Sequence, residues 1–193
     1  AGAPSLAPDN LLSPLVDQLL GDHEVPMLVV RRGRDIEGRL PWAHARAVVP
    51  VTGTANARAA QEVAFNLSNR LGTEIVLTHV LEPARASVGG DGRRNGDGSD
   101  GQGVASDLLD AAERFGAKVG ARIQRSVRHG ASVAHEICAQ VVETESDLVV
   151  VGATIREGGG VFLGHTIEQI LDECDATVVA VLTPSSLPKA EPA

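Results

Sequence analysis

The sequence predicts an α/β protein with a five-stranded parallel sheet and helices on both of its faces. Short runs of β-branched and aliphatic residues alternate with amphipathic helical segments, in the order expected for successive βαβ units. Apolar residues make up 43% of the 193 residues but aromatic residues only 2%. The core therefore consists of Val, Leu, Ile and Ala, which suits a parallel sheet covered by helices.

The pattern places each element in turn. Strands are expected at 47–51, 74–80, 121–127, 147–151 and 176–182, and helices at 56–71, at 106–119, after Ser132 and at 164–173. Gly72 is expected to end the first of these helices, and Ser106 to cap the second. In a sheet of this order, ligands bind beyond the carboxyl ends of the strands, at the switch point.

The segments around and within this domain, 46–184, differ in composition. Residues 1–10 are rich in Ala and Pro and are expected to be loose, 34–45 form an Arg-bearing connector, and 185–193 form a tail. Residues 86–103 hold Gly, Asp, Ser and Arg with almost nothing apolar. We therefore expect a disordered insertion there.

The N-terminal segment is similar in sequence to the end of the domain. Residues 12–30 match residues 163–181 at a constant offset, so that Leu12 aligns with Leu163 and Val30 with Val181. Both segments read as a helix followed by a strand. We therefore expect 11–33 to be the end of a second copy, with strand 27–31 joining a sheet beside 176–182; a general likeness between helix–strand pairs is the alternative.

The stretch 147–166 carries the main functional signal. A buried strand ends at Gly152, and a glycine-bearing loop then leads into a helix. Loop amides and a positive helix end attract phosphate, and glycine lets the backbone come close. The candidate phosphate-site residues are Gly152, Gly158, Gly159, Gly160, Gly164, His165 and Thr166. The alternative is a plain strand-to-helix connection.

A second group of candidates lies at the ends of the first two strands of the domain. Thr52, Gly53 and Thr54 follow strand 47–51, and Val80 ends strand 74–80. Together they are candidates for contact with a nucleotide base or sugar. Turn chemistry, with Thr54 or Asn56 capping the next helix, is the alternative interpretation.

Composition and motifs exclude several classes of function. A net charge of −8 and the small number of aromatic residues argue against nucleic acid as a partner. His135 and Glu136 begin an HExxH pattern, but Ala139 stands where the second histidine is required, so no zinc site and no metal is expected. No nucleophile, base and metal-ligand set converges, so no catalytic residues are expected. Two separated cysteines fit a reduced, cytoplasmic setting.

The segment from about Arg46 to Pro184 resembles the universal stress protein family. That family has a five-stranded α/β sheet, often dimerises through its last strand, and in many members binds ATP or another adenine nucleotide. Its signature has a glycine, two residues, a glycine, nine residues, and then Gly with Ser or Thr. Gly152 and Gly164 match the first and last glycines. The resemblance implies an adenine nucleotide ligand (ATP, AMP or cyclic di-AMP) and a homodimer through 176–182.

The sequence departs from that signature at several positions. Ile155 stands where the second glycine belongs, the spacing from Gly152 to Gly164 is one residue short, and His165 replaces Ser or Thr. Thr52 stands where nucleotide-binding members place an Asp, and Thr cannot supply a carboxylate. These changes predict an altered phosphate pocket.

The chain is also similar to the C-terminal universal-stress module of bacterial cation/proton antiporters. The similarity rests on the VPVTGTANARAAQEVAF and FLGHTIEQIL segments and on the partial upstream copy. It implies a non-catalytic regulatory domain at the cytoplasmic face of the cell membrane, covalently attached to a membrane transport domain. A stand-alone ATP-binding universal stress protein and a structural dimerisation domain with a degenerate pocket are the alternatives.

Overall fold

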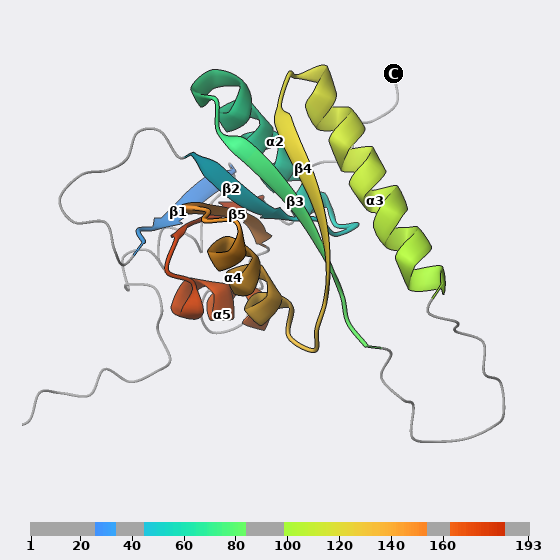
Figure 1. Ribbon diagram of the computed structural model, residues 1–193. Helices are drawn as coiled ribbons and strands as arrows, with labels where there is room; N and C mark the ends of the chain where they lie inside the picture. Colours follow the sequence, from blue (N-terminus) through green and yellow to red (C-terminus); the bar gives the residue numbers. More distant parts are fainter. Residues whose placement is uncertain (1–25, 34–44, 84–98, 154–162, 184–193) are drawn as a thin grey trace, which may run out of the picture.

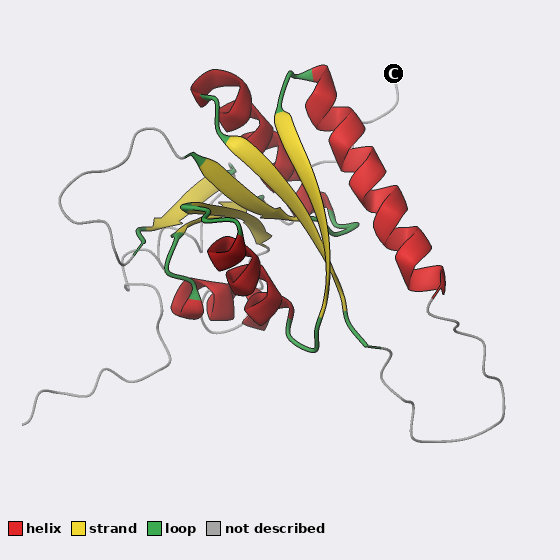
Figure 2. Ribbon diagram, viewed as in Figure 1, coloured by secondary structure: helices red, strands yellow, loops and turns green. Residues whose placement is uncertain are grey.

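A computed structural model describes residues 26–33, 45–83, 99–153 and 163–183. They form one mixed sheet of six strands, in the order β1-β6-β5-β2-β3-β4, with helices packed on both faces (Figures 1 and 2). The strands are β1 (Met27–Arg31), β2 (Arg46–Pro50), β3 (Glu74–Leu81), β4 (Arg122–His129), β5 (Leu148–Ala153) and β6 (Thr177–Leu182). The helices are α2 (Ala55–Leu71), α3 (Ser99–Lys118), α4 (Val133–Glu143) and α5 (His165–Glu173).

The five strands β2 to β6 are parallel, which confirms the predicted α/β class. The residues of β5 and β6 are almost all buried, because helices cover both faces of these strands, whereas most residues of the edge strand β4 are exposed. The core divides into two clusters. One packs the α4 and α5 side chains against the sheet, and the other packs those of α2 and α3. The strand order reverses between β2 and β5, and because the crossovers are right-handed, α2 and α3 cover one face of the sheet and α4 and α5 the other.

Local chemistry fixes the helix ends. Thr54 and Ser132 cap α2 and α4 by accepting hydrogen bonds from the backbone N–H groups of Ala57 and His135. Gly72 ends α2 in the left-handed conformation, with φ of 78°. The conformation costs little for a residue without a Cβ. The predicted cap at Gly72 is therefore confirmed.

Helix α3 differs from the prediction. It begins at Ser99 rather than at Ser106, so the predicted insertion 86–103 is wrong at its C-terminal end. Ala105 is fully buried in the core, so the helix already faces the sheet before Ser106. Burial of that face outweighs the low helix propensity of Gly101 and Gly103. The rest of the predicted insertion lies outside the described residues.

Strand β1 extends the sheet beyond β6, and it runs antiparallel to it. The predicted pairing of 27–31 beside 176–182 is therefore confirmed. Arg31 anchors the end of β1, because one guanidinium nitrogen donates to the carbonyl oxygens of Cys174 at 2.5 Å and Ala176 at 2.9 Å. The Gly33 N–H also donates to the Thr177 hydroxyl. The predicted helix at 11–20 lies outside the described residues.

Among the helices that the structure describes, none is long and apolar enough to cross a membrane.

Candidate nucleotide site at the switch point

The two groups of predicted site residues lie at the carboxyl ends of neighbouring strands. The paired residues of β2 and β5 are only Ala47 with Leu148 and Val48 with Val149, near the amino ends. The chain leaves β2 toward α2 on one face, and α5, which follows β5, lies on the other face. This is the arrangement in which doubly wound sheets open a crevice for a ligand.

The turn after β2 is exposed and hydrogen-bonded within itself. Thr52, Gly53 and Thr54 are all exposed. The hydroxyls of Thr52 and Thr54 lie 3.0 Å apart, and the Thr54 oxygen accepts from the N–H of Ala57 at 3.3 Å. Thr54 is therefore the helix cap, as the alternative interpretation expected. The Thr52 hydroxyl and the turn backbone face solvent and can contact a ligand.

A small cavity of about 170 Å³ lies behind this turn, between α2 and α3. Besides the turn residues, its walls include Arg58, Gln61 and Phe115. The Arg58 guanidinium carbon lies 5.7 Å from the centre of the Phe115 ring, which favours a cation–π contact. Arg58 is the one cation among the lining residues. The sequence analysis did not single out Arg58 as a site residue. Its position, one helical turn after the helix cap Thr54, could have indicated that it lies near the same turn.

Strand β3 supports the same turn from the side. His79 Nδ1 lies 2.8 Å from the carbonyl oxygen of Val51, the last residue before the turn. The predicted Val80 points the other way, because it packs against the core cluster beneath α4 and α5. Val80 is therefore not brought to the cavity behind Thr52.

Gly152 lies where β5 passes under the start of α2. A Cβ added there would be 2.1 Å from the carbonyl oxygen of Asn56 and 2.6 Å from the backbone nitrogen of Ala57. The absence of a side chain thus lets a helix approach the strand closely. Gly152 has this packing requirement whether or not a phosphate lies near it.

The first turn of α5 is where the sequence analysis expected a phosphate. Gly164 precedes the helix with φ of 98° and makes no side-chain cap, and His165 and Thr166 are exposed in the first turn. Backbone N–H groups at such a helix start have no intrahelical partner. Gly158, Gly159, Gly160 and Ile155 lie outside the described residues.

Arg46 and Arg128 form salt bridges that join elements of the fold. At the amino edge of the sheet, the hydrogen bond from Arg46 lowers the pKa of Glu74. Arg128 of β4 binds Glu136 and Glu143 of α4 at 2.8 and 2.7 Å, and the hydrogen bond from Arg128 lowers the pKa of Glu143. Across the described residues, no group of three His, Cys, Asp or Glu side chains is arranged to hold a metal ion.

The two cysteines, distant in sequence, are neighbours in space. Cys138 on α4 packs against the core cluster that contains Cys174, the residue that follows α5. Interaction with the Cys138 thiol, with smaller contributions from the Ala176 backbone and Arg31, lowers the pKa of Cys174 to about 7 although burial opposes the shift. Sequence reasoning gave no sign of this contact.

Comparisons with known proteins agree with the geometry. A model of the universal stress protein family matches residues 44–181. The chain therefore belongs to the universal stress protein family. A comparison with curated proteins finds no significant match.

Solved structures show the same fold at low sequence identity. A universal stress protein from Lactobacillus plantarum is 19% identical with a TM-score of 0.56, over 72% of this chain and 98% of that one. A family member from Arabidopsis thaliana with AMP bound is 18% identical with a TM-score of 0.53, over 76% and 97%. A universal stress protein from Archaeoglobus fulgidus is 21% identical with a TM-score of 0.54, and matches 84% of this chain but 51% of its own.

Proposed function

We propose that this chain is a non-catalytic domain that binds an adenine nucleotide at the carboxyl edge of β2 and β5. The observation that carries the proposal is the start of α5, where Gly164 provides no side-chain cap and where the turn after β2 lies across the switch point. Backbone N–H groups at the start of a helix suit a phosphate. The Thr52 hydroxyl and Arg58 beside the 170 Å³ cavity suit the neutral and anionic parts of a nucleotide.

Two findings outside the site support this ligand class. The chain belongs to the universal stress protein family, and one similar structure contains AMP. The cavity behind Thr52 is smaller than the few hundred Å³ that small-molecule pockets usually have, so it can take only part of a ligand. The phosphate end would then lie toward the α5 start.

The test is a calorimetric titration of the 193-residue chain with AMP, ATP and cyclic di-AMP. At least one nucleotide should bind, and His165→Ala should weaken it about fivefold to tenfold if the side chain donates to the phosphate. His135→Ala is the matched control, because His135 is an exposed residue in the first turn of α4. Absence of binding by all three nucleotides would refute the ligand class. Equal affinities of the two variants would show that the His165 side chain does not donate to the phosphate.

We further propose that the domain regulates a cation/proton antiporter from the cytoplasmic face of the membrane. The support is the similarity of the VPVTGTANARAAQEVAF and FLGHTIEQIL segments to such modules, together with the pairing of β1 as part of an upstream copy. A nucleotide could bias the transporter only by binding one of its states better than the other. The coding sequence upstream of this segment tests the proposal, and a sequence without membrane helices there would argue for a stand-alone universal stress protein.

A structural role without a ligand is the second candidate. It is favoured by Gly152, whose lack of a side chain is explained by the approach of α2 alone.

The proposed homodimer through β6 also has a structural condition. Since β6 pairs with β5 on one edge and β1 on the other, direct strand pairing between two copies requires β1 to leave.

A further inference from the structure

Gln61 on α2 carries a buried amide that the fold does not use. The residue is only 6% exposed, yet among the described residues its side chain has no hydrogen-bond partner. Gln140 on α4 lies at the same depth, at 5% exposed, and is used. Its side-chain oxygen accepts hydrogen bonds from the Ser126 hydroxyl at 2.7 Å and from the Arg128 guanidinium at 3.3 Å. Because an unpaired buried amide lowers stability, its presence at Gln61 requires an explanation.

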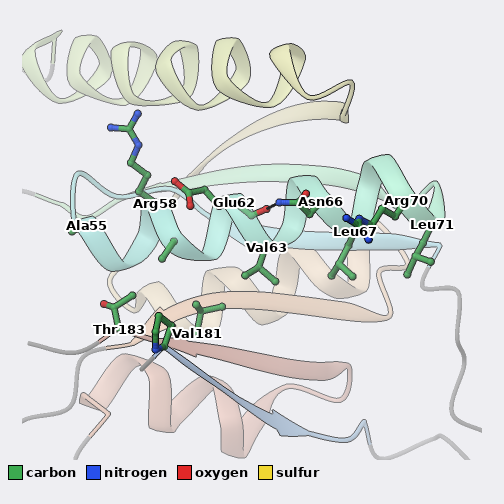
Figure 3. A pocket seen from close by; sticks show the side chains of 12 residues that line it. Ala55, Arg58, Glu62, Val63, Asn66, Leu67, Arg70, Leu71, Val181 and Thr183 are labelled. Atoms are coloured by element: carbon green, nitrogen blue, oxygen red, sulfur yellow. Dashed lines mark hydrogen bonds between the residues drawn. The ribbon is translucent and has the colours of Figure 1, made fainter. Parts of the chain in front are cut away.

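The Gln61 side chain lines the 170 Å³ cavity behind Thr52. Thr54, Arg58 and Gln61 follow one another at spacings of four and three residues, so they share one face of α2. Arg58 borders both this cavity and the groove between α2 and β6 that Figure 3 shows, and in that view its side chain points toward α3. Helix α3 forms the opposite wall of the cavity with Leu108, Ala111, Ala112 and Phe115.

The cavity has room for one flat ring system. An apolar cavity of about 150 Å³ inside a protein can hold benzene, and this cavity is of similar size. Leu108 and the two alanines of α3 give it apolar walls, and the Arg58 guanidinium packed on the Phe115 ring borders it as well. Nucleobases stack on guanidinium planes and aromatic rings. The walls therefore suit a base better than they suit a phosphate or a sugar.

The Gln61 amide supplies the polar contact that a base needs. A glutamine side chain offers an N–H donor beside a carbonyl acceptor. Adenine offers the complementary pair, because its 6-amino group donates next to a ring nitrogen that accepts, and a glutamine can form both hydrogen bonds at once. The amide that the fold leaves unpaired would thus be paired by the ligand.

We propose that Gln61 recognises the adenine base, which enters the cavity between α2 and α3 with its amino edge against the amide. This inference rests on the proposed nucleotide function and adds the orientation of the ligand. The base lies between α2 and α3, the sugar lies beside Thr52 at the exposed turn, and the phosphate extends toward the start of α5.

The first experiment compares two ligands by calorimetric titration of the 193-residue chain. The ligands are AMP and purine riboside 5′-monophosphate, which differ only in the 6-amino group. The wild type should bind AMP about tenfold more tightly, because a site built to pair with a polar group rejects the analogue that lacks it. Gln61→Met should remove this preference by weakening AMP alone. His165→Ala should weaken both ligands by the same factor, since it acts at the phosphate.

The outcomes separate this inference from the proposed function. A wild-type chain that binds neither ligand overturns both. A chain that binds AMP without preferring it to the analogue, or whose preference survives Gln61→Met, overturns the role of Gln61 and leaves the nucleotide function standing.

Thermal unfolding without nucleotide separates a binding role of Gln61 from a structural one. Gln61→Met should raise the melting temperature by about 2–4 °C, because it replaces an unpaired buried amide by an apolar chain of similar size. Gln140→Met is the matched control and should lower it, because the Ser126 hydroxyl and Arg128 each lose an acceptor. A Gln61→Met chain that melts below the wild type would show that the fold itself uses the amide, and would overturn the inference.

Discussion

Replacing Gly152 by Ala distinguishes a packing requirement from a ligand requirement at the first glycine of the family signature. If glycine is needed there only so that a phosphate can approach, Gly152→Ala should fold normally and lose nucleotide binding. The structure predicts instead a loss of stability. The added Cβ would lie 2.1 Å from the carbonyl oxygen of Asn56, whereas ordinary contacts begin at 3.4 Å.

The magnitude follows from what must move. The clashing atoms belong to the backbone of the first turn of α2, so no side-chain rotation can relieve the contact. The whole turn has to shift by more than about 1 Å, and overpacking of a close-packed core costs about 1–3 kcal/mol. Because the clash involves backbone, we expect about 3 kcal/mol, which lowers the melting temperature by about 6–12 °C for a chain of this size.

The assay is urea unfolding followed by circular dichroism, with Gly53→Ala as the control. Gly53 is also a candidate site residue, but a Cβ there would meet only Leu108, at 3.8 Å. Gly53→Ala should therefore keep the stability of the wild type within about 0.5 kcal/mol. A Gly152→Ala variant as stable as Gly53→Ala would refute the packing argument and restore the phosphate interpretation of Gly152.

Three further changes test the contacts that hold the site and the fold. Thr54→Ala removes the cap of α2 and should cost about 1 kcal/mol in urea unfolding, with Thr54→Ser restoring it. Arg128→Met removes the guanidinium that pairs with the partly buried Glu136, and it should lower the free energy of unfolding by about 2 kcal/mol. Glu74→Gln should destabilise by up to about 1 kcal/mol at neutral pH. The Arg46 hydrogen bond lowers the folded pKa of Glu74 from 4.5, so this stabilisation exists above that value and disappears as the pH falls through the folded pKa; unfolding curves that differ equally at pH 7 and at acid pH would contradict it.

Sequence reasoning placed most elements because local signals and burial agree in them. The end of α2 at Gly72 and the cap at Ser132 are examples in which residue type and backbone geometry require each other. The runs of buried Val and Leu in β5 and β6 have no polar face, and so they indicated central parallel strands.

The features that escaped prediction depend on contacts between distant segments. The approach of Asn56 to Gly152, the stacking of Arg58 on Phe115 and the meeting of the two thiols each join residues from different elements. Nothing in the local pattern of either segment specifies such a neighbour. The early start of α3 is of the same kind, since burial of Ala105 against the sheet overrides the glycines before it.

The pairing of β1 is the exception, a long-range contact that the sequence did predict. It was visible because residues 12–30 match residues 163–181 at a constant offset. In the sheet, the aligned residues Val29 and Ala180 lie opposite each other at the centre of the antiparallel ladder. The arrangement fills the edge of β6, which would otherwise expose unpaired backbone groups. Arg31 and Gly33 fasten the end of β1 to the segment 174–177, so release of β1 would break these hydrogen bonds as well as the ladder. Direct pairing of β6 with β6 of a second copy would therefore have to break all of these contacts first.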